Sequence, residues 1–241
     1  LVPDIPGLAE VDFVTNETLY RLDDLPRSLI VLGGGVDGLE YASAFARLGV
    51  QTTVVERATR LLPAADGEVA ALLLAVLEQE GVALLSGTRA LSVRKRQDLV
   101  VLEVERAGKA AGEVVGERLL IALGRKPDLE GLGLNNAGVQ YSARGILTDD
   151  CLRTTAPNIY ACGDIAGPYL LASTAEAQGI VAATNAVLPF KRRVDYRHNA
   201  SVIFTEPPLA CLGLTEEQAR RKHGRGTKVY RFSYAGMRRA M

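Results

Sequence analysis

A glycine-rich turn between two apolar stretches constrains the fold of this chain more than any other feature. Residues 28–57 read SLIVLGGGVDGLEYASAFARLGVQTTVVER. A β-branched run ends in three glycines at positions 33–35, Gly38 follows, and an alanine-rich helical pattern leads to a second apolar strand and then to Glu56. Strand, glycine turn, helix, strand and acidic residue, in that order, are the parts of a βαβ unit that binds a dinucleotide.

Each glycine of this unit has an expected role. We expect Gly33 to allow the tight turn after the first strand, Gly35 to let a pyrophosphate approach the backbone, and Gly38 to let the helix pack closely against the strand. The N–H groups and the positive dipole end at the start of the helix favour phosphate groups. Val36, which follows Gly35, belongs to the same set of candidate nucleotide-binding residues.

Charged residues near the glycines bear on which nucleotide binds. Glu56 lies about 20 residues beyond the glycines, where a carboxylate accepts hydrogen bonds from an adenosine ribose. This carboxylate would repel a 2′-phosphate, so we predict NAD(H) rather than NADP(H). Arg57, itself a candidate nucleotide-binding residue, and Arg60 keep NADP(H) as the alternative. Asp37 suits the positive end of the helix, but we expect its carboxylate to stand near the pyrophosphate and repel it.

Charge and cysteine content argue against several classes of function. The 28 basic and 28 acidic residues balance, so the sequence predicts no nucleic-acid partner and no anionic membrane surface. The longest apolar run, residues 69–77, is too short to span a bilayer. Cys151, Cys162 and Cys211 form no CxxC or CxxxxC pair, and the chain has two histidines. We therefore predict no metal site and a reducing, cytoplasmic location.

The segments around the glycine unit predict an α/β domain. Residues 1–27 hold three prolines and little periodicity, which is typical of an extended connector. Helical spacing of apolar residues predicts a helix over 66–81, followed by a third parallel strand. Alternating stretches between residues 90 and 116 predict an antiparallel β-meander. The fold class is thus a Rossmann-like NAD(P)-binding domain, a parallel sheet with a β-meander.

A second group of elements follows that domain. A continuous apolar strand over 118–123 ends at Gly124 and Arg125, at the sheet edge where α/β proteins bind ligands. Short strands are expected at 145–148 and 159–161, the latter closed by Gly163 and Asp164. The alanine-rich residues 172–187 predict a helix.

Three motifs in this order resemble the flavin-dependent pyridine nucleotide–disulfide oxidoreductases, of the dihydrolipoamide dehydrogenase and mercuric reductase type. They are residues 33–40, 123–128 and 154–164. The last of them has a threonine, a four-residue spacer, a short apolar strand, one further residue and then Gly-Asp. The resemblance covers essentially the whole chain.

The resemblance implies roles for residues in each motif. Glu40 matches a glutamate near nicotinamide and flavin, and Gly124 and Arg125 match the pair beside the bound nicotinamide nucleotide. Asp164 matches the residue that hydrogen-bonds the ribityl chain of FAD. The remaining FAD-facing candidates are Gly163, Ala172, Ser173, Thr174 and Ala175.

The resemblance also implies how the chain is divided. The expected parts are a connector from a missing FAD segment (1–27), the NAD(P)-binding domain (28–147), the C-terminal segment of a FAD-binding domain (148–190) and the start of an α+β interface domain (191–241). The redox-active cysteine pair and the His–Glu pair of the family have no match here, and His198 and His223 are expected at the surface. We therefore predict a central fragment, truncated at both ends, without catalytic residues of its own.

The predicted function is that of a piece of a homodimeric, flavin-dependent NAD(P)H oxidoreductase. The parent enzyme would pass hydride between nicotinamide and FAD, and on to a small-molecule or protein-bound disulfide or a similar acceptor. Two alternatives stay open. A non-flavin NAD-dependent dehydrogenase would need a catalytic His, Lys or Tyr in the crevice, and the sequence offers no convincing one. The other alternative is a dinucleotide-binding module without catalysis.

Overall fold

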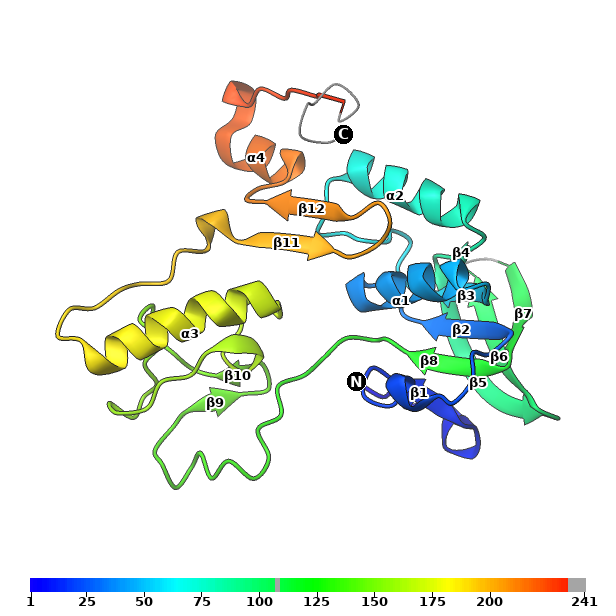
Figure 1. The fold of residues 1–241 in the computed structure, drawn as a ribbon, viewed down its shortest axis with the longest axis horizontal. Helices are drawn as coiled ribbons and strands as arrows, with labels where there is room; N and C mark the ends of the chain where they lie inside the picture. The colour runs from blue at the N-terminus through cyan, green and yellow to red at the C-terminus, as the bar shows by residue number, and fades with distance from the viewer. Residues whose placement is uncertain (107–108, 234–241) are drawn as a thin grey trace.

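A computed structural model of the chain describes residues 1–106 and 109–233. The last residues of the predicted interface domain, 234–241, lie outside that description. Figure 1 shows a sheet flanked by helices, and a second region around helix α3 that an extended segment joins to it. A hairpin near the C-terminus lies over the helices of the first region.

The first region is built on a five-stranded parallel sheet with the strand order β1-β8-β2-β3-β4. Its strands are β1 (Phe13–Thr15), β2 (Ser28–Leu32), β3 (Gln51–Val55), β4 (Ala83–Leu85) and β8 (Arg118–Ile121). Strand β2 lies at the centre, and all of its residues after Ser28 are buried. A strand covered on both faces needs a continuous apolar run, which is what the sequence provides.

Helices cover one face of this sheet, and a β-meander covers the other (Figure 1). The helices are α1 (Val36–Arg47) and α2 (Gly67–Gln79), and the meander strands are β5 (Thr88–Arg96), β6 (Leu99–Arg106) and β7 (Lys109–Gly116). Side chains alternate along β2, so that Leu29 and Val31 join the helix-side core while Ile30 and Leu32 join the meander-side core. The predicted parallel sheet and β-meander are confirmed.

The extended connector expected over residues 1–27 is wrong in part. Strand β1 pairs in parallel with β8 as the edge of the main sheet. Two 3₁₀ turns, η1 (Leu8–Glu10) and η2 (Leu19–Arg21), flank it, and their residues Leu8 and Leu19 are buried. A three-residue strand is too short to show a period of two, so only its distant partner reveals it.

The second region contains one long helix and little sheet. Its elements are β9 (Tyr141–Ser142), β10 (Gly145–Ile146), η3 (Gly163–Ile165) and α3 (Ala172–Val187). Helix α3 has the bounds that the sequence predicts. The strand expected at 159–161 is reduced to a single bridge between Arg153 and Tyr160. There the chain turns back on Thr154, whose hydroxyl donates to the carbonyl of Ile159 at 3.0 Å.

The C-terminal part begins an additional unit on top of the first region. It consists of η4 (Tyr196–His198), β11 (Ala200–Ile203), β12 (Leu209–Leu212), α4 (Glu216–His223) and η5 (Gly224–Gly226). Ile203 and Leu209 are buried in the helix-side core. His223 is exposed, as expected, whereas the side chain of His198 lies outside the description. Within the described residues, no helix has the length and apolar character needed to cross a membrane.

Candidate functional site

The glycine turn between β2 and α1 is closely packed against its own backbone. Gly33 has a φ of 117°, and a Cβ atom there would lie 2.3 Å from the carbonyl oxygen of Ala122. A Cβ at Gly38 would lie 2.0 Å from the carbonyl oxygen of Gly33. A side chain at Gly38 would therefore push the helix away from the end of β2, and a side chain at Gly33 would push the turn away from the segment that follows β8.

Gly35 differs from these two glycines because no described atom lies close enough to restrict it. It is the N-cap of α1, with φ −75° and ψ −172°, a conformation open to any residue. A Cβ there would have no atom within 4 Å. Space is thus left beside the N–H groups at the start of the helix, where anions bind most readily.

Glu56 follows strand β3 and ties the glycine turn to it. Its Oε2 accepts from the N–H of Gly34 at 2.8 Å, and its Oε1 accepts from the N–H of Ala58 at 2.7 Å. Each carboxylate oxygen can accept a further hydrogen bond. The carboxylate is therefore fixed in place and keeps acceptor capacity toward a hydroxyl group.

Gly33, Gly35 and Glu56 line one cavity of about 610 Å³ at the carboxyl ends of the strands. That volume lies within the range of about 300–1,000 Å³ common for ligand sites. Five candidates from the sequence meet there: Gly33, Gly35, Glu56, Arg57 and Gly124. Other lining residues come from the segment before β1 and from the start of the meander, namely Asp4, Ile5, Thr88, Arg89 and Ala90. No local sequence pattern marks this second set, because only the sheet topology brings it to the cavity.

The arginines near Glu56 are not equivalent. Arg60 donates to the carbonyl of Ala65 at 2.9 Å and lies 4.0 Å from Glu217, and it does not line the cavity. Arg57 and Arg89 do line it, and neither makes an ion pair within the part of the chain that is described. Two arginines thus line the same cavity as Glu56.

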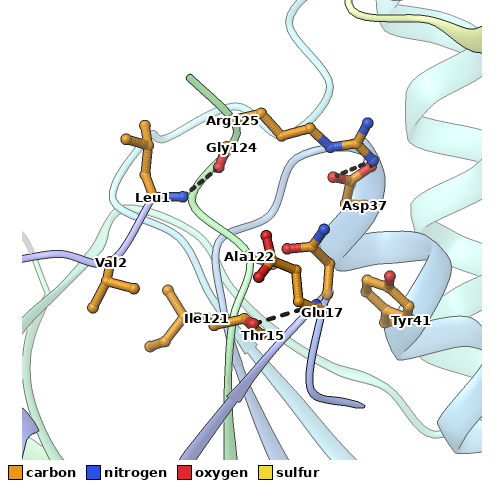
Figure 2. A pocket seen from close by; sticks show the side chains of 11 residues that line it. Leu1, Val2, Thr15, Glu17, Asp37, Tyr41, Ile121, Ala122, Gly124 and Arg125 are labelled. Atoms are coloured by element: carbon orange, nitrogen blue, oxygen red, sulfur yellow. Dashed lines mark hydrogen bonds and ion pairs between the residues drawn. The ribbon is translucent and has the colours of Figure 1, made fainter. Parts of the chain in front are cut away.

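Arg125 joins the two regions of the molecule. Its Nη2 lies 3.2 Å from Oδ2 of Asp37, in the first turn of α1, and its Nη1 lies 3.6 Å from Oδ2 of Asp164 in η3. Figure 2 shows Arg125 reaching across to Asp37. Asp37 thus has a basic partner that the sequence did not reveal, and its expected repulsion of a pyrophosphate stays a prediction. All three side chains are between 33% and 47% exposed, so each pair contributes at most about 1 kcal/mol.

A smaller cavity of about 140 Å³ lies beside this pair, and Tyr41 lines it (Figure 2). Burial and a hydrogen bond with Tyr20 raise the pKa of Tyr41, and Asp37 adds to the shift while Arg125 opposes it. The Tyr41 hydroxyl therefore keeps its proton at neutral pH.

Three candidates on α1 lie outside the lining of the larger cavity. Val36 is the first residue of the helix and is 39% exposed. Gly38 is buried beneath the turn. Oε1 of Glu40 accepts from the N–H of Phe204 at 2.8 Å, which fastens the turn between β11 and β12 to α1. The place beside nicotinamide and flavin that the resemblance implies for Glu40 stays a prediction.

The candidate flavin-facing residues lie at η3 and in the first turn of α3. Asp164 is partly exposed, and Ala172 and Ser173 are exposed. Thr174 is buried, with its hydroxyl 2.8 Å from Oδ1 of Asn199. The N–H groups of a first helical turn have no partner within the helix, so they can donate hydrogen bonds to a ligand. Gly163 and Ala175 pack against each other, since a Cβ at Gly163 would lie 3.3 Å from that of Ala175.

Sequence reasoning missed Gln178, which holds this turn in place. Its side chain is fully buried. Oε1 accepts from the N–H of Gly163 at 2.6 Å, while Nε2 donates to the carbonyl of Gly167 and to the hydroxyl of Tyr196, each at 2.8 Å. The sequence shows only a glutamine in an alanine-rich helix, which does not indicate whether its amide is buried and therefore needs partners.

The three cysteines are free thiols. Among the described residues, no three His, Cys, Asp or Glu side chains are grouped so that they could hold a metal ion.

Comparison with known proteins shows the family to which the chain belongs. Residues 1–179 match the model of the pyridine nucleotide-disulphide oxidoreductases, and residues 199–241 match that of their dimerisation domain. The chain is 42% identical to the dihydrolipoyl dehydrogenase of Thermus scotoductus over 91% of its own length and 47% of the relative's. It is 38% identical to the mercuric reductase of Bacillus cereus over 91% of its length and 35% of the relative's.

Solved structures agree with these matches. The HOCl-induced flavoprotein disulfide reductase RclA of Escherichia coli is 32% identical and superposes with a TM-score of 0.83 over 92% of this chain and 50% of RclA. LpdA of Mycobacterium tuberculosis is 34% identical, with a TM-score of 0.78 over 87% of this chain and 45% of LpdA. The chain thus spans about half the length of these proteins or less.

Proposed function

Because the chain belongs to the pyridine nucleotide-disulphide oxidoreductase family, we propose that it is the nicotinamide-nucleotide-binding part of a flavin-dependent oxidoreductase. The observation that carries this proposal is the cavity at the strand ends. Gly35 leaves space beside the N-terminus of α1 for a pyrophosphate, and Glu56 presents a fixed carboxylate at the same cavity. An acceptor group and an anion-binding helix end are what a dinucleotide needs.

Glu56 favours NAD(H) over NADP(H). Its charge would oppose a 2′-phosphate, and its free acceptor capacity suits the ribose hydroxyls. Arg60, which the sequence offers as a phosphate ligand, is engaged by Ala65 and Glu217. Arg57 and Arg89 remain at the cavity, so we expect NADPH to bind as well, but more weakly.

The second region supplies one wall of a proposed FAD site. Asp164 would accept from the ribityl chain, and the first turn of α3 would approach the flavin. The two cofactors supply the hydride chemistry when bound, while this chain binds and orients them. The acceptor of the whole enzyme is proposed to be a disulfide or a similar group, in line with relatives named as dihydrolipoyl dehydrogenase, mercuric reductase and disulfide reductase.

A homodimer is proposed for the whole protein from the match to the dimerisation domain. Within the described part of that match, the β11–β12 hairpin comes first. It packs on the nucleotide-binding region through Ile203 and Leu209. The cytoplasmic location inferred from the three separate cysteines stays a prediction.

Nucleotide titration of this chain tests the proposal. We expect isothermal titration calorimetry to show saturable NADH binding, and Glu56→Gln to weaken NADH about tenfold, in keeping with loss of hydrogen bonds to a charged group. The same change should narrow the preference for NADH over NADPH. Glu105→Gln, an exposed carboxylate on the meander, is the matched control and should leave both affinities unchanged. Absence of NADH binding, or tighter binding of NADPH by the unaltered chain, would contradict the proposal.

A further inference from the structure

We propose that Arg125 is the counter-ion that lets this chain carry Asp37 beside its pyrophosphate site, so that nucleotide affinity depends on the Asp37–Arg125 pair. This inference rests on the proposed function. Asp37 acts on the nucleotide through its charge and not by direct contact, and Arg125 is the residue that balances this charge.

The position of Asp37 on helix α1 creates the need for a counter-ion. Gly35, the N-cap of α1, lines the larger cavity, and Asp37 is the second residue of the helix, where it lines the neighbouring smaller cavity together with Arg125. A carboxylate here stabilises the helix by opposing its dipole. For the same reason it cancels part of the positive potential that would attract a pyrophosphate.

A positive charge that balances Asp37 comes from Arg125, which follows strand β8. Arg125 follows Gly124, a cavity-lining residue at the end of β8, and two contacts join its Nη2 to Asp37, at 3.2 Å to Oδ2 and 3.4 Å to Oδ1. Asp37 and Arg125 together add no net charge. The N-terminus of α1 therefore keeps its attraction for an anion although it carries an acidic side chain.

Asp164 pulls the same guanidinium toward the second region. Its Oδ2 lies 3.6 Å from Nη1 of Arg125. The contact of Arg125 with Asp37 is shorter than its contact with Asp164. Asp37 thereby holds the Arg125 guanidinium near the first turn of α1. Without Asp37, Asp164 in η3 would be the one remaining carboxylate partner of Arg125 among the described residues.

A double-mutant cycle on this chain separates the pair from its members. NADH affinity is measured for the unaltered chain, Asp37→Asn, Arg125→Gln and the double variant, at low and high ionic strength. We expect Arg125→Gln alone to weaken NADH about tenfold and Asp37→Asn to change it less than about threefold, in keeping with coupling between contacting charges. The double variant should regain most of the NADH affinity that Arg125→Gln loses. Arg125→Lys, which keeps the charge, should stay near the unaltered chain.

Salt provides a readout that a structural role would not move. The loss caused by Arg125→Gln arises from an uncompensated carboxylate, so it should shrink as ionic strength rises. Arg27→Gln removes an equal charge at the opposite ends of the strands, from a side chain 93% exposed, and should leave NADH affinity unchanged. Thermal unfolding of each variant verifies that it is folded.

Two results would overturn this inference. The first is an equal loss from Arg125→Gln with and without Asp37, because Arg125 would then act on the nucleotide alone. The second is a loss that does not depend on salt. Failure of the unaltered chain to bind NADH has a different meaning, since it would contradict the proposed function itself.

Discussion

The two regions joined by Arg125 are held together in different ways. Around the glycine turn, a parallel sheet is buried between two large apolar clusters, and backbone atoms approach each other directly. Around α3 the apolar clusters are small. There, two fully buried amides, Gln178 and Asn185, bind the surrounding loops to the helix. The first region depends on close apolar packing, and the second depends on specific hydrogen bonds.

Asn185 shows how polar the second arrangement is. Its Nδ2 donates to the carbonyls of Cys151 and Arg192 at 2.9 and 2.8 Å, and its Oδ1 accepts from the N–H of Arg192 at 2.7 Å. Gln178 lies two turns earlier on the same face of α3 and binds the loop around Gly163. Such networks are specific when every member is satisfied, and costly when one is removed.

Alanine substitution at one glycine in each region should have opposite effects, and the larger effect is expected in the first region. At Gly38 the new Cβ would lie 2.0 Å from the carbonyl oxygen of Gly33. We expect Gly38→Ala to lower the free energy of unfolding by about 2–3 kcal/mol, the cost of overpacking, and to weaken NADH strongly. Gly179→Ala, inside α3, meets no atom within 4 Å. It should stabilise the protein by up to about 1 kcal/mol, because alanine favours helix.

Urea unfolding and NADH titration measure both variants of this pair. The contrast between the regions fails if Gly38→Ala is as stable as the unaltered chain and binds NADH equally well. A marked loss of stability from Gly179→Ala would also count against it, since it would reveal a close contact in the second region.

Removing one buried amide should weaken the second region and spare the first. Gln178→Leu leaves the N–H of Gly163 and the carbonyl of Gly167 without their side-chain partner. The cost is about 1–3 kcal/mol, the usual penalty for unsatisfied buried groups. NADH affinity should not change. Hydrogen exchange followed by mass spectrometry should show that Gln178→Leu speeds exchange in residues 151–170, relative to the unaltered chain. Exchange in the peptides of β2 and α1 should not change.

Glu176→Ala is the matched control on the same helix. Its side chain is exposed, so the free energy of unfolding should change by less than about 0.5 kcal/mol. Equal exchange in all peptides of Gln178→Leu would show that the amide network does not hold the second region.

Local sequence patterns predicted most of the elements. They did not predict the parts of the site that depend on how the strands are ordered in the sheet. The glycine turn, Glu56 and the bounds of α3 follow from residues close together in the sequence, where spacing reports directly on geometry. Strand β1 and the cavity contributions of Ile5 and Thr88 do not, because their partners lie far along the chain. The same holds for the amide of Phe204 on Glu40.

Asp37 is the clearest example of that limit. Its position in the first turn of α1 could be predicted, and its effect on pyrophosphate could be argued, but its partner could not be seen. Arg125 reaches it only because β8 lies next to β2 in the sheet and both strands end at the same edge. Side-chain pairs across parallel strands depend on strand order, which the sequence leaves open until the topology is known.

Cysteine reactivity gives the smallest but most local test of the comparison. Cys162 is exposed beside Gly163 in the second region. Cys211 lies on β12 against the helix-side core of the first region, where burial raises the pKa of its thiol and Asp66 adds to the shift. Because the thiolate is the reactive form, we expect a maleimide reagent at neutral pH to modify Cys162 well before Cys211.

Peptide mapping after timed quenching assigns each modified thiol, and denaturant provides the control. The raised pKa means that the folded state holds the proton of Cys211 more tightly, so its rate should keep rising with pH above the range of an ordinary thiol. In urea both cysteines lose their surroundings and should react at similar rates. Early modification of Cys211 in the folded chain would show that the β11–β12 hairpin separates readily from α1 and α2. The hairpin would then have to be grouped with the second region, which has only small apolar clusters, and not with the core of the first.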